Sequence, residues 1–402
     1  MAGPLLFILL MLVSGLSVCY RLPVWVRYAV DVILIAWAAA AFLIRPQRKR
    51  LGFCLTLAAV CLIPFLFAWL WSLGVWVIRL EEPAYIARGS RNTLYMLVNA
   101  LFVGAVFYLF GRRGAAYVLC GMALANGAML AQAVAKEGVL TLAREYATLL
   151  LTWTGQTGTA IARLELHDIV FAWGAFVIYG LVSGKGRRGR ERWGTLTAAF
   201  FFVLSLKRIA VAGVILACVA AVIWRRISGQ RCFLWVMAVA GTAAALAWVD
   251  LVRSGALAQI AALLHINMMG RESTYAMYDA VYEFSPLYMG RGIRFVYEYG
   301  LLNGVSSSMH SVYVEQFIAL GFIGMAIWML TMMIPLFFVS GRYGGRAAAF
   351  LVAVTVYLLV TYVTDNTLFH YPVNTVIWLL TMNECAEGGR VHGDCDDPYA
   401  DI

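Results

Sequence analysis

Charged residues are scarce in this sequence: they make up 13% of its 402 residues, whereas hydrophobic residues make up 63%. Soluble globular proteins carry about 25% charged residues, so this chain has too few to cover a soluble surface. Apolar stretches of about 20 residues, long enough for a helix to cross a bilayer, recur along the whole length. The composition excludes a soluble globular protein and predicts an all-α polytopic membrane protein.

The motifs of several enzyme classes are also missing. The eight cysteines include no CxxC pair, and none lies in the longest polar segment, so they indicate neither a zinc site nor a disulfide framework. No HExxH, GxSxG or Walker sequence occurs, and no cluster of acidic residues resembles a metal site. We therefore expect no metal ion and no cofactor.

Twelve apolar segments are predicted to cross the membrane. They are residues 4–20, 24–44, 51–78, 93–111, 115–135, 165–183, 193–206, 208–224, 232–250, 311–339, 347–364 and 372–384. This assignment places nine spans within 1–250, a long polar loop at 251–310, three spans within 311–384 and a tail at 385–402.

Short basic loops alternate with loops of mixed charge. The basic loops contain a single acid, Glu191, and lie around residues 45–50, 112–113, 185–192, 225–231 and 342–346. The mixed loops are 79–92, 136–164, 251–310 and 365–371. Because short basic loops stay in the cytoplasm, both termini are expected there and the loop 251–310 outside. The same rule explains the net charge of +10, so we expect no nucleic-acid partner.

One predicted hairpin is too short for the bilayer. Residues 193–224 must cross twice between cytoplasmic arginines, which leaves about 23 Å per crossing at about 1.5 Å per residue, against a core of about 30 Å. The hairpin apex carries Lys207 and Arg208, which we expect below the outer interface in a water-filled or ligand-filled cavity. Snorkelling of these side chains with local thinning of the bilayer is the alternative. A second short apex, 365–372, is a candidate lining of the same cavity.

Ionisable residues also gather at the outer entrance of the sixth predicted span. Arg163, Glu165, His167 and Asp168 fall within six positions. An interfacial ion-pair cluster and a ligand site both explain this grouping. Under the second interpretation, Arg163 and His167 bind substrate.

The loop 251–310 and the start of the next span hold most of the candidate binding residues. A helical stretch places Arg271 and Tyr275 on one face, and a glycine-flanked turn presents Arg291 and Arg294. Further along, His310 and Tyr313 open the next span.

The chemistry of these residue types suits a phosphorylated glycan. Arginine side chains bind phosphate through two parallel hydrogen bonds. Tyrosine rings suit sugars, with an interfacial aromatic belt as the alternative. A histidine at the head of a helix can act as a general base or donate a hydrogen bond to an anion.

The order of these residues resembles that of a known family. A Ser-x-Lys-Arg apex at 205–208 is followed by Arg271 in the outer loop and by Pro-Leu-x-x-Gly-x-Gly at 286–292. His-Ser-x-Tyr-x-Glu and a downstream Gly-x-x-Gly then occupy 310–324. This pattern is similar to that of the bacterial O-antigen ligase/polymerase superfamily (WaaL and Wzy types), over about residues 163–340. Ser311 stands where that family usually has asparagine.

The resemblance implies a GT-C-like fold and a metal-independent, inverting glycosyltransferase. Such enzymes use undecaprenyl-pyrophosphate-linked glycans at the outer face of the bacterial inner membrane. By position, Arg208 and Arg271 would hold the pyrophosphate, and His310 would act at the reaction centre. The residues that would contact substrate are Lys207, Arg163, His167, Arg291, Arg294, Tyr275 and Tyr313.

Three activities remain open at this stage. The first is a polymerase that joins lipid-linked repeat units into a surface polysaccharide, with a chain-length regulator and a flippase as candidate partners. The second is a ligase that transfers a finished glycan to lipid A core or to another acceptor. The third is a transporter of lipid-linked oligosaccharides, although the two halves of the chain share no visible repeat.

Overall fold

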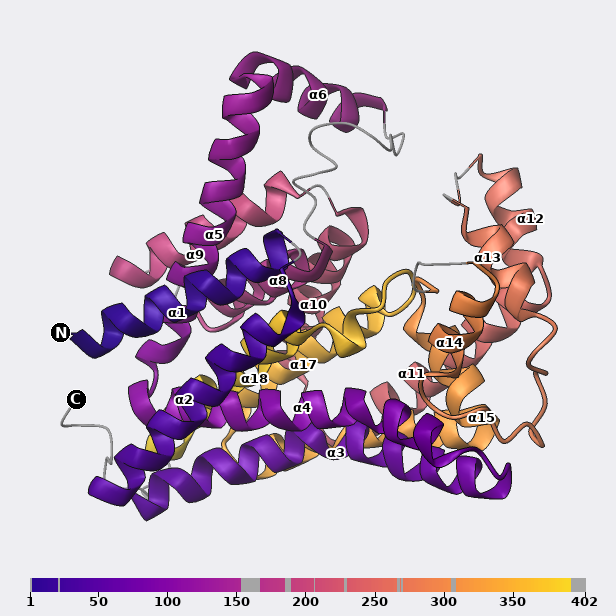
Figure 1. Cartoon of the computed structure of the whole chain (residues 1–402), viewed down its shortest axis with the longest axis horizontal. Helices are drawn as coiled ribbons and strands as arrows, with labels where there is room; N and C mark the ends of the chain where they lie inside the picture. The colour runs from indigo at the N-terminus through magenta and orange to yellow at the C-terminus, as the bar shows by residue number, and fades with distance from the viewer. Residues whose placement is uncertain are drawn as a thin grey trace.

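The computed structural model describes residues 2–20, 22–152, 167–184, 189–205, 207–227, 230–265, 268, 270–304 and 309–391. Within these residues every regular element is a helix and no strand occurs (Figure 1). The prediction of an all-α fold is therefore confirmed.

The helices follow the predicted apolar segments closely. Each of the twelve segments overlaps a helix, and the segment 311–339 is divided between two. The first nine helices of the bundle are α1 (Ala2–Cys19), α2 (Val24–Ile44), α3 (Arg48–Ile78), α4 (Pro83–Phe110), α5 (Arg113–Glu137), α8 (His167–Val182), α9 (Gly189–Leu204), α10 (Arg208–Arg226) and α11 (Gln230–Arg253). The remaining ones are α15 (Val312–Thr331), α16 (Ile334–Arg342), α17 (Gly345–Thr361) and α18 (Tyr371–Val391).

Shorter elements lie between these helices. They are α6 (Val139–Thr152), α12 (Ala256–Leu263), α13 (Arg271–Tyr278), α14 (Phe295–Leu302) and the 3-10 turn η2 (Thr367–Phe369). Seven helical stretches of the described chain, with α15 and α16 counted as one, are long and apolar enough to cross a membrane. The protein is thus an all-α, multi-pass membrane protein.

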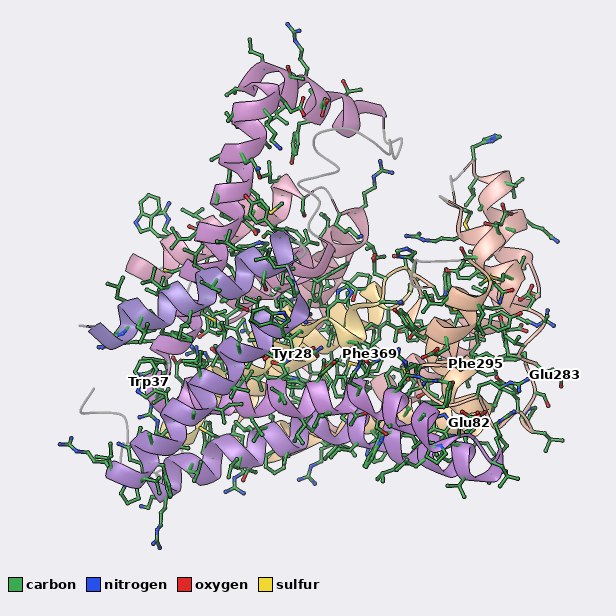
Figure 2. All side chains as sticks on the ribbon, viewed as in Figure 1. Tyr28, Trp37, Glu82, Glu283, Phe295 and Phe369 are labelled. Atoms are coloured by element: carbon green, nitrogen blue, oxygen red, sulfur yellow. The ribbon has the colours of Figure 1, made fainter. Side chains whose placement is uncertain are left out.

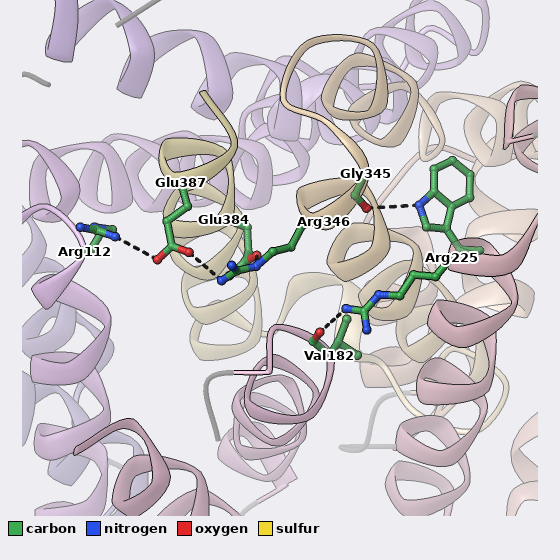
Figure 3. A network of polar contacts seen from close by, with 8 residues as sticks. Arg112, Val182, Arg225, Gly345, Arg346, Glu384 and Glu387 are labelled. Carbon is green, nitrogen blue, oxygen red and sulfur yellow. Dashed lines mark hydrogen bonds and ion pairs between the residues drawn. The ribbon is translucent and has the colours of Figure 1, made fainter. Parts of the chain in front are cut away.

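Polar contacts join residues of the short basic loops to one another or to the end of α18, at one end of the bundle. At one end of the bundle, Arg346 bonds Glu384 at 3.1 Å and Glu387 at 2.6 Å, and Arg112 bonds Glu387 at 3.0 Å (Figure 3). Arg225 donates to the Val182 carbonyl at the same end. The helices α12–α14 of the long loop lie at the opposite end from the start of α1 (Figure 1). The basic loops and the long loop therefore occupy opposite ends of the molecule.

Helix lengths differ sharply around the long loop. With 31 and 28 residues, α3 and α4 are about 46 Å and 42 Å long, whereas α8 and α9 with 16 residues each are about 24 Å long. A bilayer core is about 30 Å thick, so α8 and α9 are too short to cross it in full. Helix α9 is therefore short, as predicted for this hairpin, whereas α10 with 19 residues is long enough to cross a membrane.

The loop is docked into a kink of α15. At Gly321 the backbone leaves the helical region with φ 73°, which frees the carbonyls of the preceding turn. The N–H groups of Arg291 and Gly292 donate to the carbonyls of Ile318 and Ala319 at 2.9 and 2.7 Å. The loop backbone thus supplies hydrogen bonds that the broken helix lacks.

Helix α3 holds the same turn from the other side. The Arg79 guanidinium donates to the Gly290 carbonyl at 2.9 Å, and the Ser72 hydroxyl accepts from the Ile293 N–H at 2.9 Å. A side chain on Gly292 would collide with the indole of Trp76. The glycines of the Pro-Leu-x-x-Gly-x-Gly segment are therefore required for close packing of the loop on the bundle.

We expect Gly321→Ala to undock the loop. An alanine with a φ of 73° and a ψ of −175°, a conformation that almost only glycine adopts, costs about 1–3 kcal/mol, and its Cβ would also collide with the Tyr288 carbonyl. Trypsin should then cleave the detergent-purified protein at Arg271 faster than it cleaves the wild type. The control is Gly341→Ala, because a Cβ there meets no atom within 4 Å. Equal cleavage of the two variants would contradict the docking role.

Candidate functional site

Two short apices meet in a buried ion pair. Lys207 precedes α10, and Asp365 lies in the turn after α17; the Lys207 Nζ atom is 3.1 Å from Asp365 Oδ1. Their side chains are only 10% and 5% exposed. The sequence made the second apex a candidate lining of the same cavity as the first; the structure brings the two apices together, and the cavity itself stays a prediction. The interaction joins the hairpin of α9 and α10 to the turn before α18.

Aromatic side chains lie beside this pair. The Phe171 ring, near the start of α8, lies 5.6 Å from Lys207 Nζ. The His370 ring lies 6.4 Å from Phe171, and the Tyr357 hydroxyl donates to the Phe171 carbonyl at 3.2 Å. An ammonium group over an aromatic face gains electrostatic stabilisation. The lysine is therefore held by a carboxylate and by an aromatic ring.

The long loop reaches the same place through α13. Tyr275 is 6% exposed, and burial raises the pKa of its hydroxyl. The nearby Arg271 charge lowers this pKa, the Asp365 carboxylate raises it, and a hydrogen bond with Ser311 lowers it. Tyr275 thus lies within electrostatic reach of both Arg271 and Asp365. That Arg271 and Tyr275 act together on a substrate stays a prediction.

His310 is held in an uncommon backbone conformation at the start of α15. Its φ is 54°, in the left-handed region that few residues other than glycine adopt. Ser311 next to it is fully buried and accepts a hydrogen bond from the Trp248 indole at 3.3 Å. The Val312 N–H donates to the Tyr362 carbonyl at 3.0 Å. Buried neighbours therefore fix the backbone of His310, as is common where a residue has a function.

Other predicted site residues have structural partners. Arg294 bonds Glu298 at 2.8 Å, and Arg291 donates to the Val281 carbonyl at 3.4 Å. The Tyr313 hydroxyl donates to the Leu359 carbonyl at 2.7 Å and ties α15 to α17. The first two contacts lie within the loop, and the third joins two helices of the bundle.

The remaining predicted residues lie at the margins of the described chain. Arg208 begins α10 directly after Lys207 and is exposed. Arg163 lies outside the described residues. His167 begins α8, and only its backbone is described. The grouping of Arg163 with His167 therefore stays a prediction.

The chain matches no protein-family model and no curated protein. Membership of the O-antigen ligase/polymerase superfamily therefore stays a prediction.

Asp365 was not among the residues assigned a role from the sequence. The available signal was its place in a very short outer turn, before His370. Since an aspartate in such a turn is commonly a turn or cap residue, only its distance to Lys207 reveals a different role.

The side chains around the ion pair define the chemistry that is available here. Lys207 and Asp365 are opposite in charge, and two arginines, Arg208 and Arg271, begin the helices α10 and α13. No group of three or more histidine, cysteine or acidic side chains suited to a metal occurs among the described residues. The chemistry available is hydrogen bonding, charge stabilisation and proton transfer through histidine.

We expect Asp365→Asn to destabilise the protein by about 3–5 kcal/mol, because it leaves a buried ammonium group without its carboxylate. The measurement is thermal unfolding of the purified protein in detergent. The double variant Lys207→Met/Asp365→Leu should recover most of the loss. Asp279→Asn is the control, since Asp279 and Arg253 are 33% and 36% exposed and 3.8 Å apart. A similar loss in the control would refute the role of burial.

Proposed function

We propose that this protein is an inverting, metal-independent glycosyltransferase that polymerises undecaprenyl-pyrophosphate-linked repeat units into a surface polysaccharide. The observation that carries the proposal is the buried ion pair of Lys207 and Asp365, which joins two segments far apart in the sequence and whose carboxylate raises the pKa of Tyr275 in the long loop. Asp365 and Tyr275 lie in loops of mixed charge, and Lys207 lies at the apex of the α9–α10 hairpin, away from the basic loops. A lipid-linked pyrophosphate needs cations at such a place, within reach of both the membrane and water.

The membrane arrangement follows from the same proposal. The chain would cross the bacterial inner membrane twelve times in a GT-C-like fold, with both termini in the cytoplasm and 251–310 outside. The short helices α8 and α9 would place the Lys207 apex below the outer surface. The donor would then enter laterally from the outer leaflet, with its pyrophosphate at the depth of Arg208.

The reaction would be a single displacement at the anomeric carbon of the donor sugar. Arg208 and Arg271 bind the pyrophosphate and stabilise the charge that grows on it as the bond to the sugar breaks. The acceptor hydroxyl attacks from the opposite face, so the configuration inverts. His310 takes the proton of that hydroxyl, and undecaprenyl pyrophosphate leaves. Alternatively, His310 donates a hydrogen bond to the leaving group.

The same site would also serve a ligase, which differs only in its acceptor. The lipid-linked glycan that accumulates in a deletion strain separates the possibilities. A single repeat unit indicates a polymerase, a long unattached polymer indicates a ligase, and material on the cytoplasmic face indicates a flippase. The polymerase proposal requires the first outcome.

His310→Ala should cause single lipid-linked repeat units to accumulate and reduce polymer by at least about 100-fold, the usual contribution of general acid–base catalysis. Extraction and mass analysis of the lipid-linked glycans measures this. The control is His265→Ala, because His265 has a similar φ of 53° in the same loop but is exposed. Normal chain length in His310→Ala would remove His310 from the mechanism.

Turnover by the purified protein should be unchanged by EDTA, because the proposed chemistry relies on guanidinium groups and histidine. Polymer formation from lipid-linked repeat units, with and without chelator, is the measurement. Loss of activity with EDTA and its return with one divalent cation would refute metal independence.

A further inference from the structure

The long loop begins with an exposed apolar helix, α12. Its residues Ile260 and Leu263 are 42% and 79% exposed, and Leu264 directly after it is 60% exposed. These three share one side of the helix, because positions three and four residues apart lie on the same face. On the adjoining side, Leu257 packs against the core and Ala261 is buried. The helix therefore carries a packed and an unpacked apolar ridge next to each other.

The segment around α12 has no charge with which to face water. No lysine, arginine, aspartate or glutamate occurs between Arg253 and Arg271. A helix at a water-exposed surface normally carries charged or polar side chains on its outer face. Single exposed leucines are common on proteins, but a cluster of large apolar side chains marks an interaction surface. The exposed ridge of α12 therefore calls for an apolar partner.

The preceding helix, α11, leads the chain from the membrane to α12. It is long and apolar enough to cross a membrane. Exposed apolar residues run along it from Trp235 and Val239 to Ala247, and the exposed Asp250 ends this run. Since a carboxylate is costly in the hydrocarbon core, Asp250 marks the level at which α11 leaves that core.

A tight turn joins the two helices. The N–H groups of Ser254 and Gly255 donate to the carbonyls of Asp250 and Val252 at 2.8 and 3.2 Å, so the chain stays coiled up to the start of α12 at Ala256. Six residues at about 1.5 Å each put that start about 9 Å from Asp250. The headgroup layer on each side of a bilayer core is about 5–8 Å thick. Helix α12, at the margin of the molecule in Figure 1, therefore begins at the level of the headgroups.

We propose that α12 is an interfacial helix that lies on the leaflet next to the long loop, with Ile260, Leu263 and Leu264 among the acyl chains. The lipid surface is the partner that the chain itself brings there, because α12 begins where the lipid-facing run of α11 ends. The helix thus anchors the start of the long loop to the membrane, while the turn at Gly290 and Gly292 anchors its middle to α15 and α3. This role does not depend on whether the protein is a glycosyltransferase.

The test places the photoreactive residue p-benzoylphenylalanine at position 263 of the full-length protein. Membranes of the expressing cells are irradiated, and the purified protein is analysed by mass spectrometry and gel electrophoresis. We expect a mass gain of one phospholipid, because the probe lies among acyl chains. Since Leu263 is largely exposed, its replacement leaves the fold intact. The same probe at position 264 should give the same adduct.

Ala262 and Glu283 are the matched control positions. Ala262 is exposed on the same helix but turned by about 100° from Leu263. Glu283 is exposed at the margin of the same loop (Figure 2). We expect at least about tenfold less phospholipid adduct at both controls, the ratio by which an apolar side chain prefers lipid to water.

Three results would overturn the proposal. The first is the absence of a phospholipid adduct at positions 263 and 264. The second is an equal yield of adduct at 262, 263 and 283. The third is cross-linking of position 263 to a second copy of the chain or to another protein in place of lipid, which would make α12 a protein-binding surface.

Discussion

The ion pair between Lys207 and Asp365 joins the parts of the molecule on which the candidate site depends. A lysine in the middle of a hydrophobic bundle costs several kcal/mol unless a carboxylate and close packing offset its desolvation. Here the partner comes from a turn about 160 residues later in the chain, 3.1 Å away. Because neither residue is stable there alone, the α9–α10 hairpin and the turn before α18 must form together.

The long loop is attached to this core by backbone as much as by side chains. Gly321 breaks α15, and the carbonyls released by the break receive the N–H groups of Arg291 and Gly292. Helix α3 fixes the opposite side of the same turn through Arg79 and Ser72. A loop held in this way keeps α13, with the buried Tyr275, at a fixed place on the bundle.

Buried residues of opposite charge occur at two places in this bundle. At Lys207 and Asp365 the opposite charges meet directly, whereas at Arg27 and Asp31 they remain apart. The first pair needs no ligand to be satisfied.

The sequence by itself determined the all-α fold, the position of every long helix and the division of the loops into two sets, because hydrophobic run length and loop charge are local properties. It also indicated that the hairpin with Lys207 is too short for the bilayer. Only the tertiary structure decided that Asp365 is the partner of Lys207 and that Arg291 and Arg294 form contacts within the loop. It also decided that the loop docks where α15 is broken at Gly321. Those contacts join segments far apart in the chain, and pairing across such distances depends on packing that no local pattern encodes.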